Sequence, residues 1–358
     1  MPTPFLLSRV LLRFNDKSED LLGQLSAVTL TPDGSCWVGS DELNTIERLS
    51  PVEPYIFGNH RSFVVNDFIP LVNQEDEIDI EGFGYFDSYL WITGSHSQTR
   101  GKPKGKNPEK DIRRLAEIKP NANRFLIARI PVVKGELYQS CPHPDDPGKT
   151  LTAACVQLTK AGNLLTEVLQ EDSHLGHYVA IALPSKENGF DVEGLAVHKN
   201  TLFLGLRGPV LRGWAIILEI EVEELEPGVL TLKTIGEDGR KYKKHFVDLN
   251  GLGIRELCFC KKDLIILAGP TMQLEVTMRV FRLKDLLHKN KDSMTGESSD
   301  DLEVLFDLPL TIGSDHAEGA SIFPCLGQKK ALLVVYDAPD ATRRIEPDAI
   351  LADVFLLE

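Results

Sequence analysis

A short motif recurs along the chain, and each copy is followed, after a polar turn, by an apolar run of β-type residues. The clearest copy is Asp191-Val192-Glu193-Gly194-Leu195-Ala196, in which a glutamate and a glycine precede apolar residues. Recurrence of this kind predicts an array of similar supersecondary units. The central residues of the copies are Ser26, Glu81, Glu193, Glu256 and Glu318, and the copies at Ser26 and Glu256 are the most divergent.

Each unit contains four segments with the composition of β-strands. In the unit of Glu193, the motif is followed by apolar segments at 201–204 and 215–220 and by a segment at 245–249 that leads into the next motif. Four strands are the repeating unit of a β-propeller blade. Glu193, Glu256 and Glu318 follow one another at intervals of about 60 residues. The sequence therefore predicts an all-β fold, a five-bladed β-propeller that forms a single domain over residues 1–358.

The interval between Glu81 and Glu193 is much longer than the others, which predicts an insertion in the second blade at about residues 97–177. Apolar spacing indicates a helical insertion, with a short helix at 110–118 and a second at 152–170. The segment 178–184 is expected to be the strand that leads into Asp191. At the chain ends, residues 5–14 are expected to complete the last blade beside 350–357, because the sheet edge would otherwise be exposed.

The net charge of −14 argues against nucleic acid as a partner and suits a cation as a ligand. No apolar run is long enough to span a bilayer, so no membrane partner is expected. Arg9 and Arg13 interrupt the apolar stretch at the N-terminus, which argues against a signal peptide and favours a cytoplasmic location. The six cysteines form no C-x-x-C pair, so a zinc ribbon or a redox motif is not expected.

The glutamates of the motif are the first candidate site. Because each begins the innermost strand of a blade, Glu81, Glu193, Glu256 and Glu318 should converge near the mouth of the central channel. Carboxylates gathered in one ring repel, by roughly 3 kcal/mol per pair, so Arg255, a metal ion or protonation must offset the repulsion. Oxygen ligands suit Ca²⁺ or Mg²⁺. The alternatives are backbone hydrogen bonds that latch neighbouring blades together and direct acid–base catalysis.

Residues that leave the second strand of each unit should surround the same mouth. They differ in chemistry from unit to unit, which favours a ligand site, although polar loop tips are also common without function. His316 stands two residues before its glutamate, at the position that Asp79 and Asp191 occupy in two other copies. With His96 it is a candidate general base, and a structural, hydrogen-bonded role is the alternative for each. The catalytic candidates are His96, Arg207, His316 and Asp337.

Three sequence features together carry a family resemblance. They are the Asp-x-Glu-Gly-Leu-Ala motif, the segment Leu183-Pro184-Ser185-Lys186 with Asn188-Gly189 before it, and Gly205-Leu206-Arg207-Gly208-Pro209 after it. With these features the chain resembles a bacterial family of propeller-type proteins catalogued as domain of unknown function 3616, over nearly its whole length. The Asp-Val-Glu-Gly core is also similar to that of the esterase-like phytase group. That resemblance implies an acidic, calcium-dependent centre at Glu81, Glu193 and Glu318.

Two functions fit these features. One is a hydrolase that activates water at the channel mouth against a phosphate ester, a carboxylic ester or a lactone, with Arg207 binding an anionic group. The other is a non-catalytic binding module for a small molecule or a protein partner at the same face. The fold cannot separate them, because propellers carry out both. Chelator-sensitive turnover would favour the first, and a stable complex without turnover would favour the second.

Overall fold

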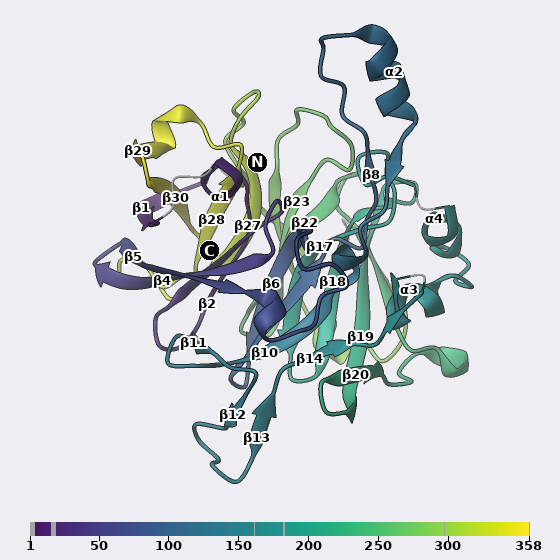
Figure 1. Cartoon of the computed structure of the whole chain (residues 1–358), viewed down its shortest axis with the longest axis horizontal. Helices are drawn as coiled ribbons and strands as arrows, with labels where there is room; N and C mark the ends of the chain where they lie inside the picture. Colours follow the sequence, from purple (N-terminus) through teal and green to yellow (C-terminus); the bar gives the residue numbers. More distant parts are fainter. Residues whose placement is uncertain (1–3, 16–18, 161, 182, 297, 358) are drawn as a thin grey trace.

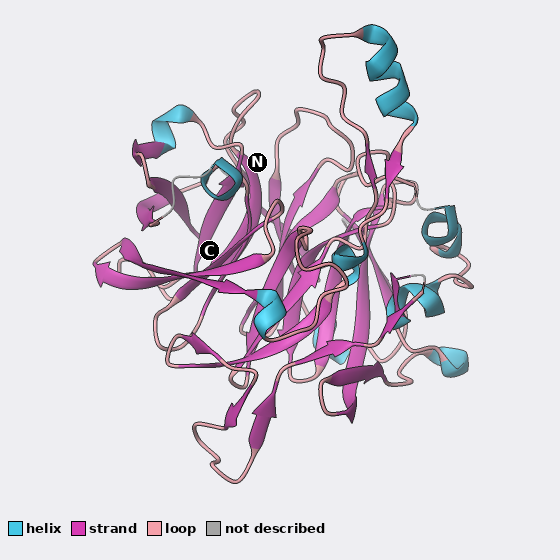
Figure 2. Ribbon diagram, in the orientation of Figure 1, coloured by secondary structure: helices cyan, strands magenta, loops and turns pink. Residues whose placement is uncertain are grey.

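The computed structural model describes residues 4–15, 19–160, 162–181, 183–296 and 298–357. Strands dominate these ranges, and helices are few and short (Figure 2). The all-β fold predicted from the sequence is confirmed. None of the helices in the described ranges combines the length and the apolar composition needed to cross a membrane.

Most strands belong to five groups, each of four strands paired antiparallel to the next in the group. Group 1 contains β2 (Leu25–Leu30), β3 (Cys36–Ser40), β4 (Thr45–Glu53) and β5 (Ile56–Val64). Group 2 contains β6 (Ile80–Phe86), β7 (Tyr89–Gly94), β10 (Ile127–Val133) and β14 (Ala154–Val156). Group 3 contains β17 (Asp191–His198), β18 (Thr201–Gly208), β19 (Trp214–Glu226) and β21 (Lys243–Asp248). Group 4 contains β22 (Gly253–Cys260), β23 (Asp263–Gly269), β24 (Arg279–Leu283) and β26 (Leu302–Asp307). Group 5 contains β27 (His316–Ile322), β28 (Ala331–Asp337), β30 (Ala349–Leu356) and β1 (Leu6–Arg13).

The N-terminal strand closes group 5 as the sequence predicts. β1 pairs antiparallel with β30, from Leu6 opposite Phe355 to Arg13 opposite Ala349. It also pairs in parallel with β5, where Leu11 lies opposite Ile56. Figure 1 shows β1 and β30 side by side, although they lie at opposite ends of the chain.

The groups do not remain five separate sheets. The parallel contact between β1 and β5 joins groups 1 and 5 into a nine-stranded sheet. A parallel contact between β14 and β20 (Val229–Leu232) joins groups 2 and 3 into an eleven-stranded sheet, and group 4 alone stays a four-stranded sheet. The prediction of five distinct blades is therefore not confirmed by the sheet topology, because outer-edge pairing merges neighbouring groups.

The first strands of the five groups contact one another in a closed order. β2 contacts β6, β6 contacts β17, β17 contacts β22, β22 contacts β27, and β27 contacts β2 again. The glycine of the motif permits these approaches, since a Cβ at Gly82 would lie 2.7 Å from the Leu195 side chain, and one at Gly194 would lie 2.8 Å from that of Leu257. With neighbours on both sides, β17 is buried along nearly its whole length.

Each first strand carries a β-bulge or similar irregularity at the same place, and this aligns the five groups independently of the sequence motif. In β17 the pairing with β18 skips Glu193, and in β22 the pairing with β23 skips Arg255. Glu256 therefore takes the position of the motif glycine, and aligning it with the other glutamates was wrong by one residue. We call the five residues at this place the bulge residues: Ser26, Glu81, Glu193, Arg255 and Glu318.

The insertion between β7 and β17 is less helical than the sequence predicts. The expected helix at 110–118 is present as α2 (Pro108–Ala116), which projects from the body on a long arm (Figure 1). The helix expected at 152–170 is wrong in its first half, which forms β14 and short hairpin strands, and only α3 (Leu164–Leu169) is helical. The strand expected at 178–184 is instead α4 (Gly176–Ile181), followed by residue 182, which lies outside the described residues.

The remaining elements are short and lie at group edges or in connections. The helices are α1 (Glu19–Leu22), η1 (Val65–Asp67), η2 (Ala122–Phe125), η3 (Glu237–Gly239), η4 (Leu286–His288) and η5 (Ala341–Arg343). The strands are β8 (Thr99–Arg100), β9 (Ile118–Lys119), β11 (Glu136–Leu137), β12 (Ser140–Pro142), β13 (Thr150–Thr152), β15 (Leu158–Thr159), β16 (Gly162–Asn163), β25 (Ser293–Thr295) and β29 (Arg344–Glu346).

Candidate functional site

Two arginines hold the bulge residues of groups 3, 4 and 5 together. Nη1 of Arg207, on β18, donates a hydrogen bond to Glu193 Oε1 at 2.7 Å. Nε of Arg255 lies 2.8 Å from Glu193 Oε2, an ion pair without hydrogen-bond alignment, and its Nη2 donates to Glu318. Glu193 and Arg255 are almost completely buried. The repulsion expected among these glutamates is thus offset by arginine charge, one of the three means the sequence left open.

Ser26 and Glu256 connect neighbouring groups through the backbone. The Ser26 hydroxyl donates to the carbonyl oxygen of Ile80 in group 2. Oε1 of Glu256 accepts from the amide of Leu195 in group 3 at 3.1 Å and from that of Leu257 at 2.8 Å, while Oε2 is buried without a partner. Burial raises the pKa of Glu256 well above its usual value, although both amide hydrogen bonds oppose the rise. For Glu256, the structure favours the latch between units over a ligand role.

A second set of acids lies between groups 1, 2 and 3. Burial raises the pKa of Glu81 well above its usual value, and Glu193, Asp79 and Asp191 raise it further by charge repulsion. Burial, together with Glu193, raises the pKa of Asp191 to about 8, even though Arg207 opposes the shift. Burial and nearby carboxylates, Asp79 first, likewise raise the pKa of Asp41. These groups therefore hold protons to higher pH than free carboxyls do.

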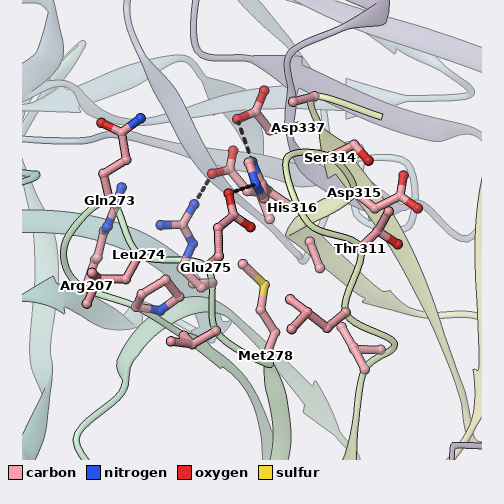
Figure 3. Close-up of a pocket in the computed structure, with 18 of the residues that line it drawn as sticks. Arg207, Gln273, Leu274, Glu275, Met278, Thr311, Ser314, Asp315, His316 and Asp337 are labelled. Atoms are coloured by element: carbon pink, nitrogen blue, oxygen red, sulfur yellow. Dashed lines mark hydrogen bonds and ion pairs between the residues drawn. The ribbon is translucent and has the colours of Figure 1, made fainter. Parts of the chain in front are cut away.

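A cavity of about 430 Å³ opens beside the central cluster (Figure 3). Its walls come from all five groups or their connections, and two loops, 270–278 and 308–315, form much of its rim. Lys186 lies on its lining, as does Lys102 from the base of the insertion arm. The ionisable residues that line it include Asp41, Glu42, Arg207, Arg255, Glu275, His316, Glu318 and Asp337.

His316 lies in this cavity between two carboxylates. Its Nδ1 is 3.9 Å from Asp337 Oδ2, and its Nε2 is 3.5 Å from Glu275 Oε1 (Figure 3). The position follows from strand pairing, because His316 at the start of β27 lies opposite Asp337 at the end of β28. Asp337 raises the pKa of His316, with burial opposing it and Glu275 adding to it. About a third of the side chain is exposed, so a ligand in the cavity can reach the ring.

The structure brings together three of the four catalytic candidates and separates the fourth. Arg207, His316 and Asp337 line the same cavity. His96 faces a different hollow beside Phe125, where its Nδ1 lies 2.8 Å from the Gly94 carbonyl oxygen and its Nε2 lies 2.8 Å from Asn163 Nδ2. Burial lowers its pKa to about 4, so the ring is neutral and both nitrogens are occupied. The expected pairing of His96 with His316 is therefore wrong, and His96 holds the insertion against group 2.

The four glutamates expected to bind a metal do not meet in one site. Glu193 and Glu318 bind Arg255, and Glu256 binds backbone amides. Glu81 has no hydrogen bond or ion pair to another described residue. Across the described ranges, no group of three or more His, Cys, Asp or Glu side chains is placed to hold a metal ion. This arrangement does not fit the Ca²⁺ or Mg²⁺ centre expected from the sequence.

Sequence reasoning missed two parts of the cavity. Glu275 and Met272 belong to loop 270–278, which carries no repeat signature, and no local pattern distinguishes it from an ordinary connection. Arg255 stands next to Glu256 in the sequence, but a motif defined by its glutamate does not place Arg255 among the bulge residues. The missing glycine after Glu256 was the available signal of this shift.

The family of this chain is shown by a comparison with protein-family models. The family model described as "Protein of unknown function (DUF3616)" matches residues 24–353. The chain belongs to this family. The sequence-based resemblance to it is thereby confirmed, whereas the resemblance to the esterase-like phytases stays a prediction. No curated protein matches the sequence of this DUF3616 member.

Several solved structures are similar to this DUF3616 protein at low identity. Virginiamycin B lyase from Staphylococcus aureus is 11% identical, with 98% of this chain and 99% of that chain covered and a TM-score of 0.37. The PQQ-bound aldose sugar dehydrogenase from Streptomyces coelicolor is 11% identical, covers the same shares and has a TM-score of 0.39. A luciferin-regenerating enzyme is 6% identical over 97% of this chain and 94% of that chain, with a TM-score of 0.37.

Proposed function

We propose that the chain is a hydrolase that cleaves a small carboxylic ester or lactone in the central cavity. The observation that carries the proposal is the position of His316 between Asp337 and Glu275, inside a cavity of small-molecule size. We also propose that the five strand groups act as the blades of a five-bladed propeller. In that arrangement, the closed order of first strands brings the cavity walls together.

The chemistry follows from the protonation states of the lining residues. Neutral His316, oriented by Asp337, accepts a proton from a water molecule as the water oxygen attacks the ester carbonyl. Asp41, whose raised pKa lets it hold its proton to higher pH than a free carboxyl does, donates a proton to the departing alkoxide. Arg207 and Arg255 lie on the lining, where the positive edge of either guanidinium can attract the carbonyl oxygen as it becomes negative.

Charge on the lining favours an ester or lactone over a phosphate ester. Arg207 and Arg255 are already matched by Glu193 and Glu318. The carboxylates around them would repel a phosphate dianion, whereas a neutral carbonyl compound meets no such repulsion. No step of this mechanism uses a metal ion.

The test is turnover of p-nitrophenyl acetate, γ-butyrolactone and p-nitrophenyl phosphate by the full chain, with kcat/KM measured against pH. The base works only when it is deprotonated, and the pKa of His316 is raised. The acidic limb of the kcat/KM profile should therefore have its midpoint above the pKa of free histidine. Asp337→Asn removes the largest cause of that shift, so the limb moves to lower pH. His316→Gln abolishes turnover of γ-butyrolactone, and His177→Gln, at an exposed position of α4, leaves it unchanged.

A binding module is the second candidate, and a specific observation favours it. Apolar side chains stand exposed on the two rim loops, with Leu274 at 56% and Leu310 at 49% exposure, and Ile312 at 80%. Exposed apolar rims are common at interaction sites. If none of the three substrates is turned over but one raises the melting temperature through the His316 cavity, the protein is a binding module and the hydrolase proposal is wrong.

A further inference from the structure

A histidine in group 3 connects a buried glutamate to a serine at the surface. Nε2 of His245, on β21, lies 2.9 Å from Glu219 Oε2 on the neighbouring β19. Its Nδ1 lies 2.8 Å from the hydroxyl of Ser293, directly opposite on β25. His245 is almost completely buried, whereas Ser293 is partly exposed. None of these residues lines the central cavity.

The direction of the hydrogen bonds follows from the charge of Glu219. Although burial opposes it, hydrogen bonds from His245 and Lys243 lower the pKa of Glu219, so this carboxylate is ionised and can only accept. Nε2 of His245 must therefore donate to Glu219. In the neutral ring this leaves the lone pair of Nδ1 to accept the proton of the Ser293 hydroxyl. A serine whose hydroxyl donates to an oriented histidine is the arrangement of an activated nucleophile.

A similar pair elsewhere in the fold lacks the serine. Nε2 of His60 lies 2.6 Å from Glu47 Oε2, again joining the third and fourth strands of a group. Its Nδ1, however, accepts from the backbone amide of Asn15 at 3.1 Å. Ser62 is close by, but its hydroxyl donates to Glu47 and not to the ring. The His60 pair is therefore structural, and the difference at His245 is the presence of a reactive group.

Ser293 opens onto a surface hollow of about 530 Å³ that shares no lining residue with the central cavity. The preceding loop supplies Lys289, Asn290 and Lys291 to its walls. The loop is fixed by Asp292, which accepts from the amide of Lys244 at 3.0 Å and from Arg240 at 2.9 Å. The nucleophile is thus held in place in a hollow whose lining includes Lys291 and Lys289, the second of which also pairs with Asp301 at 3.3 Å.

The geometry points to a second catalytic site, in which Ser293, His245 and Glu219 cleave a carboxylic ester that carries an anionic group. The Ser293 oxygen bonds to the carbonyl carbon while its proton passes to His245 Nδ1. That proton then leaves with the alcohol. Water next attacks the acyl-serine, giving a proton to His245, and the free acid departs as Ser293 regains its hydrogen. In serine proteases Nε2 accepts the serine proton and Nδ1 donates to the acid, whereas here Nδ1 accepts and Nε2 donates. The histidine is the general base and the acid orients it in both cases.

The experiment uses a fluorophosphonate ester as the probe, because it forms a stable bond to activated serines. We expect one adduct per folded chain, which peptide mapping places on Ser293. Ser293→Ala is not labelled. His245→Asn is labelled more slowly by a factor of about 100 or more, since the general base is lost. Ser62→Ala, the matched control beside His60, is labelled like the natural chain.

The readouts separate this site from the central cavity. The water-based mechanism at His316 has no serine to label, so His316→Gln keeps the Ser293 adduct, and Ser293→Ala keeps the His316-dependent turnover. If His245→Asn does not fold, as judged by its thermal melt, Glu219→Gln replaces it and should slow labelling. The proposal is overturned if the natural chain is not labelled or if the adduct lies at another residue. It is also overturned if Ser293→Ala is still labelled, or if the variant that replaces His245 or Glu219 is labelled as fast as the natural chain.

Discussion

The first strands of groups 3 and 4, β17 and β22, use the same backbone irregularity for opposite purposes. In β17 the bulge presents Glu193, an acid whose two oxygens face two arginines. In β22 it presents Arg255, and the acid that follows, Glu256, accepts hydrogen bonds from backbone amides. One carboxyl is surrounded by positive charge, and the other is buried away from it. Position in a repeat therefore fixes where a side chain points, while its neighbours fix its protonation.

The largest effect should come from breaking the ionic side of this comparison. Glu193→Gln leaves Arg207 and Arg255 buried without their shared counter-charge, so the free energy of unfolding should fall by about 3–5 kcal/mol. Urea denaturation at pH 7 measures this change. Adding Arg207→Gln should restore part of the loss, because one unpaired charge is removed. If Glu193→Gln were as stable as the natural chain, the arginine bridge would not hold the groups together.

A smaller effect is expected from the backbone latch. Glu256→Ala leaves the amides of Leu195 and Leu257 without their acceptor, which should cost about 1–3 kcal/mol in unfolding free energy. The same denaturation experiment measures it, and amide hydrogen exchange at Leu195 should rise. Glu226→Ala on the exposed end of β19 is the control and should change stability little. A loss as large as that of Glu193→Gln would show that Glu256 also takes part in the charge network.

The smallest effect at acidic pH should come from Glu256→Gln, and its size depends on pH. The folded pKa of Glu256 is raised, so its contribution to stability is complete below the unfolded pKa and declines as pH rises. Glutamine keeps the Oε1 acceptor and cannot ionise. The variant should therefore match the natural chain within about 1 kcal/mol at pH 4 and exceed it at pH 8. Urea midpoints at pH 4, 6 and 8 decide this, and a variant less stable at every pH would mean that Glu256 is ionised in the fold.

The part of the fold that could be predicted depends on local patterns. Alternation and turn residues mark each four-strand unit, and the leftover N-terminal strand has one open edge to fill, so the pairing of β1 with β30 followed. Outer-edge contacts such as β14 with β20 carry no such pattern. The helix predicted at 152–170 failed for a related reason, because short apolar runs suit both helix and strand until tertiary neighbours select one.

The sequence by itself determined the repeat, the all-β fold, the family and the gathering of Arg207, His316 and Asp337 near one face. Tertiary structure alone decided that Arg255, not Glu256, is the bulge residue of β22, that His96 turns to Asn163, and that Ser293 meets His245. The physical reason is that the periodicity of a strand is determined by residues adjacent in the sequence. The pKa and partner of a side chain instead depend on burial and on charges brought from distant segments.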